Sequence, residues 1–170
     1  METQLINRVA NSGIITINLE DFYPTCDFKV FDISDFLFHG LILKEKEFRT
    51  ALKELDWSVF RDKTVLILCS TDAIVPLWAY MLISQYLHGG ANDIFVGTEK
   101  EFIKTWYYHA LEKFDWTPYE NQKIVVKGCG HKTVPEDAYA RITKHLMPIA
   151  GSIMFGEPCS TVPVYKKKLM

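Results

Sequence analysis

Thr64-Val65-Leu66-Ile67-Leu68-Cys69 is followed directly by Ser70-Thr71-Asp72 and, shortly after, by Pro76. A continuous run of β-branched and apolar residues is typical of a strand covered on both faces, as in a parallel sheet. Ser, Thr and Asp are common helix N-cap residues, and proline is favoured in the first helical turn. The stretch therefore predicts a buried strand leading into a helix, which should end near His88 because Gly89-Gly90 follow.

The same alternation continues toward the C-terminus. Further strands are predicted at residues 93–97, 123–127 and 152–155, with helices between them that begin near Thr98 and Thr133. Strands that alternate with helices imply right-handed crossovers and a parallel sheet. We therefore expect an α/β fold, specifically a three-layer sandwich with a mostly parallel, doubly wound, Rossmann-like sheet.

The 170 residues are expected to form a single domain spanning residues 1–170. Residues 63–156 would be the βαβαβαβ core and residues 157–170 an extended tail. Residues 1–62 would supply N-terminal strands and a helix that cover or extend the sheet. No internal repeat, low-complexity segment or Gly/Ser linker is apparent.

Bulk composition narrows the classes of function. Apolar residues make up 48% of the chain and the net charge is −2, which predicts a globular protein without a nucleic-acid partner. Residues 1–4 lack a basic region followed by an apolar run, and no apolar stretch is long enough to span a bilayer. We therefore expect a cytoplasmic protein with no membrane partner. In that reducing compartment its four cysteines would be buried thiols, metal ligands or reactive thiols.

Three cysteines follow predicted strands at the point where each strand ends. Cys69 ends the first clear strand, Cys129 follows the third and Cys159 follows the fourth. If the cysteine-free strand at 93–97 lies at the edge of the sheet, all three thiols would meet at the carboxyl rim, where open α/β sheets bind ligands. With His131 as a fourth ligand, this set would suit zinc, and three sulfurs alone would suit an iron–sulfur cluster.

Other interpretations of these cysteines stay open. Free cysteine is among the most buried residue types, so all three are compatible with a purely structural role. Alternatively, Cys129 and His131 are candidate catalytic residues. Cys129 lies between Lys127 and Lys132, and nearby positive charge or His131 could lower its pKa. Cys129 would then be the nucleophile of an enzyme for sulfur or acyl transfer.

A third hypothesis is a non-catalytic interaction protein that forms a homo-oligomer. It rests on the helix at 73–87, which is apolar nearly all round and should be central or lie against a partner chain. Glu20, by contrast, belongs to an acidic group whose spacing fits no calcium loop, so we expect it on a solvated face.

Two motifs carry a resemblance over nearly the whole chain: Lys127-Gly128-Cys129, and the stretch Gly-Glu-Pro-Cys-Ser-Thr-Val-Pro at 156–163. On these the chain resembles an uncharacterised bacterial family of unknown function. The resemblance implies no established activity, cofactor or catalytic residue. It does imply an iron–sulfur assembly partner, which would favour metal or persulfide chemistry at Cys129 and Cys159.

Overall fold

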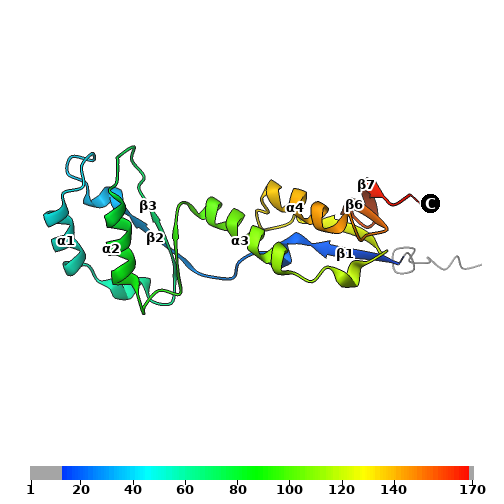
Figure 1. Ribbon diagram of the computed structural model, residues 1–170, viewed down its shortest axis with the longest axis horizontal. Helices are drawn as coiled ribbons and strands as arrows, with labels where there is room; N and C mark the ends of the chain where they lie inside the picture. The colour runs from blue at the N-terminus through cyan, green and yellow to red at the C-terminus, as the bar shows by residue number, and fades with distance from the viewer. Residues whose placement is uncertain (1–12, 169–170) are drawn as a thin grey trace, which may run out of the picture. The chain divides into compact units, whose positions relative to one another are not determined.

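The computed structural model describes residues 13–168. The expectation that residues 1–4 do not begin a signal peptide therefore concerns residues outside the described part of the chain. The chain is an α/β protein that divides into two compact units. Unit 1 comprises Met1–Pro24 and Ile103–Met170, and unit 2 comprises Thr25–Phe102, so unit 2 is inserted into the sequence of unit 1 (Figure 1). Among the described residues, the helices are too short or too polar for any of them to cross a membrane.

Unit 2 contains a parallel sheet in the order β2-β3-β4. Its core is built on β3, where Val65, Leu66 and Ile67 are all fully buried, as the sequence predicts. Helices α1 and α2 contribute Phe48 and Ile83 to the same core. The elements are β2 (Phe28–Asp32), the 3-10 helix η2 (Ile33–Phe36), α1 (Glu45–Glu54), η3 (Trp57–Phe60), β3 (Thr64–Leu68), α2 (Leu77–Leu87) and β4 (Asp93–Val96).

Unit 1 contains a sheet in the order β1-β5-β6-β7, in which the first three strands are parallel and β7 is antiparallel to β6. Ile124, Val125 and Ile153 form the buried centre of this sheet, and Ile142 of α4 is also fully buried. The elements are β1 (Ile14–Asn18), η1 (Leu19–Phe22), α3 (Glu99–Lys113, whose residues up to Phe102 belong to unit 2), η4 (Thr117–Tyr119), β5 (Lys123–Lys127), α4 (Glu136–Leu146), β6 (Ser152–Glu157) and β7 (Ser160–Lys166).

The α/β class and the predicted strands are confirmed, but the strands do not form one sheet. The strands at 64–68 and 93–96 pair in unit 2, and those at 123–127 and 152–157 pair in unit 1. The reason is that the two N-terminal strands do not extend a common sheet: β2 pairs with β3, and β1 pairs with β5. The predicted extended tail pairs with β6 as β7.

The two units have similar arrangements of elements, because residues 59 positions apart make equivalent hydrogen bonds. Trp57 (Nε1) donates to the carbonyl of Leu52 at 2.8 Å, and Trp116, at position 57 + 59, donates to the carbonyl of Leu111 at 3.0 Å. In both units, therefore, an indole satisfies a carbonyl near the end of the helix that precedes the central strand.

The turn before the central strand is duplicated as well. Asp62 and Asn121 both have a φ of 58°, in the left-handed region where Asp and Asn are enriched. The N–H of Asp62 donates to the carbonyl of Gly90 at 2.9 Å, and that of Asn121 to the carbonyl of Ile149 at 2.8 Å. The structure thus contains an internal duplication, and the expectation of no repeat is wrong.

Candidate functional site

The loop between β5 and α4 carries the candidate site, and all of its neighbours belong to unit 1. The loop contains Cys129, whose side chain is exposed. Because β1, β5 and β6 are parallel and adjacent, their carboxyl ends meet at one edge of the sheet. That edge brings together the loop, the η1 segment after β1, and the β6–β7 turn.

Glu20 of η1 anchors this loop. Its carboxylate accepts hydrogen bonds from the N–H of Gly130 and, at 3.3 Å, from the N–H of His131. The Lys132 ammonium donates to the backbone carbonyl of Glu20 at 3.4 Å. Desolvation raises the pKa of Glu20, but the hydrogen bonds from the loop backbone outweigh it and hold the pKa below its ordinary value. The carboxylate therefore stays ionised at neutral pH and accepts the hydrogen bonds from the loop backbone.

The η1 segment is itself fixed from both sides. The buried Tyr107 hydroxyl of α3 donates to the carbonyl of Leu19 at 2.9 Å. The side chain of Asn18 accepts from the N–H of Glu20 at 3.2 Å and caps the 3-10 helix. Glu20 is thus presented to the loop by a rigid support.

Both glycines that flank Cys129 are required by close approach of other groups. A Cβ on Gly128 would lie 2.8 Å from the hydroxyl of Tyr139 and 3.1 Å from the Cβ of Leu19. A Cβ on Gly130 would lie 2.5 Å from Glu20 Oε1. The Gly-Cys-Gly sequence therefore lets the loop lie directly against Tyr139 on one side and Glu20 on the other.

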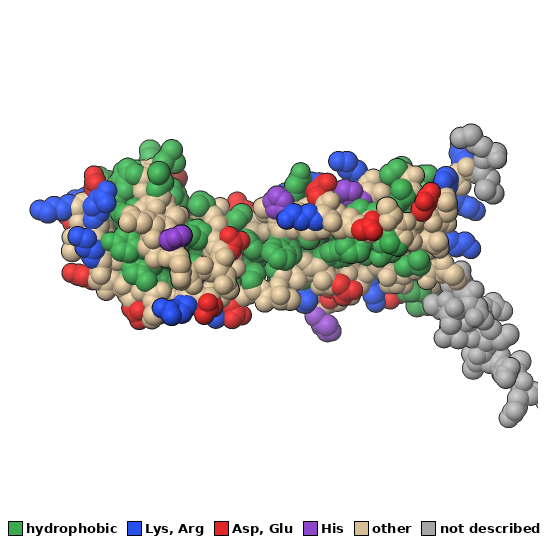
Figure 2. Space-filling model, turned by 60° about the horizontal axis from the view of Figure 1, so that its bottom comes forward, with side chains coloured by type: hydrophobic (Ala, Val, Ile, Leu, Met, Phe, Trp, Pro, Cys, Tyr) green, Lys and Arg blue, Asp and Glu red, His purple; other side chains and the backbone are tan. Residues whose placement is uncertain are grey.

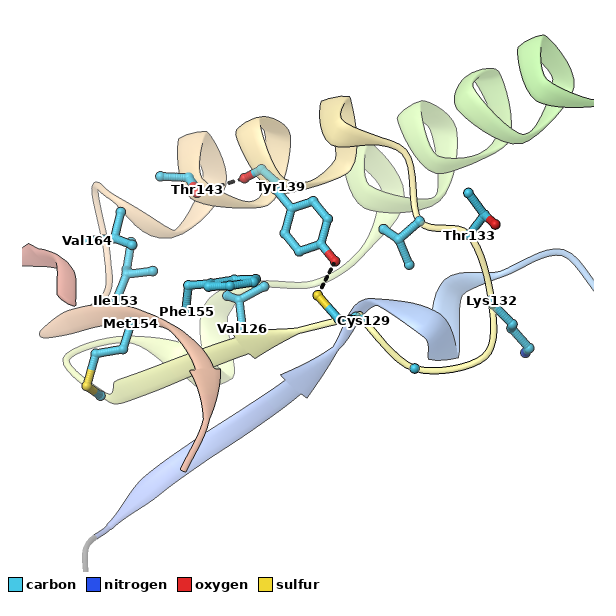
Figure 3. Close-up of a pocket in the computed structure, with 13 residues that line it drawn as sticks. Val126, Cys129, Lys132, Thr133, Tyr139, Thr143, Ile153, Met154, Phe155 and Val164 are labelled. Atoms are coloured by element: carbon cyan, nitrogen blue, oxygen red, sulfur yellow. Dashed lines mark hydrogen bonds between the residues drawn. The ribbon is translucent and has the colours of Figure 1, made fainter. Parts of the chain in front are cut away.

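Tyr139 of α4 is the side chain that contacts the thiol. Its hydroxyl lies 3.8 Å from the sulfur of Cys129, and the two side chains point toward one another (Figure 3). Burial, and then the hydrogen bond to Cys129, raise the pKa of Tyr139 to about 12. The phenol therefore keeps its proton at neutral pH and is a hydrogen-bond donor. Its ring packs edge-on against Phe155, with 5.8 Å between centroids.

Cys129 lies at the boundary between two cavities of different character. The larger has a volume of about 660 Å³ and a mostly apolar lining. The smaller, of about 420 Å³, is less apolar, because its lining also includes the charged or polar side chains of Glu20, Lys127, His131 and Glu157. The apolar side chains of the larger cavity are Val126, Val134, Ile153, Met154, Phe155 and Val164. In the close-up view Val126 and Phe155 lie nearer the thiol, and Ile153, Met154 and Val164 lie further away from it (Figure 3).

The predicted site residues are brought together only in part. Cys129 and His131 share the loop, but in the described part of the chain no hydrogen bond joins the imidazole of His131 to the sulfur of Cys129. Cys159 is exposed in the β6–β7 turn of the same sheet. Cys69 follows β3 in unit 2, where its sulfur lies 3.4 Å from the hydroxyl of Thr71.

The strand order that would have gathered three thiols at one rim is therefore not found. β3 and β4 form their sheet with β2, so Cys69 ends a strand of a different sheet from the one that carries Cys129 and Cys159. Across residues 13–168, the His, Cys, Asp and Glu side chains form no group of three that could hold a metal ion. The zinc or iron–sulfur hypothesis gains no support from this geometry.

Two side chains of the candidate site are not predicted from the sequence. Glu20 was expected on a solvated face, and Tyr139 only on the apolar side of its helix. The available signal was the pair of glycines around Cys129, because glycines flanking a reactive side chain indicate that other groups approach the backbone closely.

The duplicated loop of unit 2 does not repeat this chemistry. Asn18 and Asp32 each end a strand and cap the 3-10 helix that follows, so Ser34 of η2 corresponds to Glu20 of η1. Ser70 lies 59 positions before Cys129, and the hydroxyl oxygens of Ser34 and Ser70 lie 2.9 Å apart. Asp32, equivalent to Asn18, accepts from the N–H of Ser70 at 3.0 Å. The thiol site is therefore a property of unit 1.

Fold and site together define an α/β protein with an exposed loop thiol that lines an apolar cavity and a smaller cavity with charged side chains. Residues 3–167 match the family described as protein of unknown function (DUF2480), and the chain belongs to that family. No curated protein and no solved structure matches it.

Proposed function

We propose that Cys129 is a nucleophile that accepts an acyl group from a thioester or another activated ester. The observation that carries the proposal is the position of Cys129, which lines both an apolar cavity of about 660 Å³ and a smaller cavity that contains charged side chains. An acyl donor has the same two halves, an apolar chain and a polar leaving group, joined at the carbonyl carbon that a thiolate attacks.

In the reaction the Cys129 thiolate attacks the carbonyl carbon and forms a tetrahedral oxyanion. We assign the hydroxyl of Tyr139, which lies 3.8 Å from the sulfur and is protonated at neutral pH, as the donor to that oxyanion. Collapse of the intermediate breaks the bond to the leaving group and leaves the acyl group on Cys129. The departing thiolate or alkoxide takes up a proton equivalent to the one that Cys129 lost, so the exchange needs no oxidant or reductant.

Acyl transfer is favoured over sulfur transfer by the size and lining of the larger cavity. Sites for small organic ligands have volumes of roughly 300–1,000 Å³ and mostly apolar walls. A cavity of about 660 Å³ lies within that range. A persulfide adds only one sulfur atom to the thiol, which would fill a small part of this cavity. A free, exposed thiol also fits the reducing cytoplasm expected from the sequence.

The proposal is tested by asking which cysteine a chemical acyl donor modifies. The protein is incubated with p-nitrophenyl octanoate at neutral pH, and the modified residue is found by mass spectrometry of the intact protein and its peptides. We expect one octanoyl group on Cys129. Cys129→Ser should abolish the rapid phase of p-nitrophenol release, and Tyr139→Phe should slow it.

Cys159→Ser is the matched control, because Cys159 is also exposed and belongs to the same sheet but does not line the larger cavity. It should react like the wild type. Equal labelling of Cys129 and Cys159 would mean that ordinary exposure explains the reaction, and the proposal would be wrong.

A further inference from the structure

The outer face of α2 in unit 2 exposes large apolar side chains. Ile74, Leu77 and Met81 are 94%, 81% and 74% exposed, and their spacing places them on one side of the helix and its N-terminal approach. The helix itself, from Leu77 to Leu87, contains no charged residue. A surface helix normally carries polar or charged residues on the face away from its core.

The internal duplication supplies a comparison within the same chain. The positions 59 residues further on are Thr133, Glu136 and Ala140, and α4 carries five acidic or basic residues: Glu136, Asp137, Arg141, Lys144 and His145. The inner faces of the two helices, by contrast, match position by position: Ala79, Ile83 and Leu87 of α2 and Ala138, Ile142 and Leu146 of α4 are all buried. The fold thus does not require an apolar outer face, and α2 has one for another reason.

A second apolar segment leaves the same edge of the unit 2 sheet. Phe38, Leu41 and Ile42 are 41–65% exposed in the loop that follows η2. This segment and the approach to α2 both start at the carboxyl ends of the adjacent strands β2 and β3 (Figure 1). We call these six residues the apolar face of unit 2, and Figure 2 shows hydrophobic side chains at the surface of this unit (Figure 2).

We infer that the apolar face of unit 2 is the contact surface for a second copy of this chain. A fully exposed Leu, Ile or Met side chain offers on the order of 100 Å² of apolar area. Weighted by their exposed fractions, the six side chains offer about 400 Å². Since interfaces are roughly 60% apolar, this corresponds to an interface of about 700 Å² per partner, close to the roughly 800 Å² of a standard specific complex.

The absence of charge on α2 favours a second copy over other partners. Two copies related by a twofold axis bring the same patch together, which requires a patch without unpaired like charges. Helices that lie on membranes carry Lys and Arg on their polar face, and α2 has neither. The contact is distinct from the Cys129 site, because it uses none of the residues that line the two cavities there.

Sedimentation velocity of the whole chain over a wide concentration range tests the inference. The wild type should form a dimer. Met81→Glu should weaken it by about 100-fold or more, because dimerisation would bury an uncompensated charge. Ala140→Glu places the same side chain at the equivalent position of α4 and should leave the dimer unchanged. Leu77→Gln, which introduces a neutral side chain, should also weaken association. This variant provides the test if Met81→Glu does not fold.

Three results would overturn the inference. One is a wild type that stays monomeric at all concentrations. Another is a dimer that Met81→Glu and Leu77→Gln leave intact when circular dichroism shows native folding. The third is a monomer that floats with phosphatidylcholine vesicles, which would identify a lipid surface as the occupant.

Discussion

Gly128→Ala should push Tyr139 away from Cys129 and destabilise unit 1. The backbone of Gly128 does not lie in the left-handed region, so the effect comes from the new methyl group. That group would lie 2.8 Å from the Tyr139 hydroxyl, 3.1 Å from the Leu19 Cβ and 3.3 Å from Val134 Cγ2. Overpacking of this kind costs about 1–3 kcal/mol. In a chain of this length each kcal/mol lowers the melting temperature by roughly 2–4 °C.

The double variant Gly128→Ala/Tyr139→Phe isolates the cause. Removing the hydroxyl removes the shortest of the three contacts, so the second substitution should recover part of the loss. Urea denaturation of the wild type, both single variants and the double variant should give a coupling free energy of about 1 kcal/mol. Gly90→Ala is the control, because its new methyl group would meet only a carbonyl at 3.8 Å. If the destabilisation of the double variant equals the sum of the two single-variant effects within about 0.5 kcal/mol, the assigned contact between Gly128 and Tyr139 is wrong.

Three further predictions concern tyrosine titration, the duplication and the rim of the site. The pKa of Tyr139 is raised to about 12, first by burial, above the ~10 expected when unfolded, so the folded chain holds this proton more tightly. The free energy of unfolding should then fall as pH rises from about 10 to about 12, and Tyr139→Phe should reduce that fall in urea titrations. Trp57→Phe and Trp116→Phe should each cost about 1–3 kcal/mol by chemical denaturation, since each leaves an equivalent carbonyl without its donor. Glu157→Gln should change the free energy of unfolding by less than about 1 kcal/mol by the same assay, because its 3.3 Å pair with Lys127 is exposed to solvent.

The sequence predicts the elements well because their signals are local. The run from Thr64 to Leu68 is a buried strand and Leu77–Leu87 is a helix, as apolar continuity and the Gly89-Gly90 stop indicate. Strand pairing is not local. Whether β3 neighbours β5 depends on where β1 and β2 insert, and no pattern within 14–18 or 28–32 specifies a partner. The division into two sheets could not be predicted for that reason.

The sequence indicates Cys129 as a candidate reactive residue, which stays a prediction, and it does not indicate the groups that surround Cys129. Cys129 stood out through its flanking glycines and neighbouring lysines. Glu20 acts through two backbone N–H groups contributed by residues more than a hundred positions away, and Tyr139 through a contact across a helix–loop boundary. The Glu20 contact depends on β1 lying beside β5, a pairing that the sequence leaves open. The Tyr139 contact joins residues ten positions apart and depends on how α4 packs after the loop.

The dependence of Cys129 acylation on acyl-chain length tests the central claim most directly. With p-nitrophenyl esters from acetyl to decanoyl, each methylene that enters the apolar cavity should raise the second-order rate constant up to about fourfold, from roughly 0.8 kcal/mol per buried methylene. Val164→Trp, which narrows the cavity from β7, should flatten that rise and leave the acetyl rate unchanged. A rate that is independent of chain length, or one that Val164→Trp leaves unaltered, would show that the cavity does not receive the acyl chain.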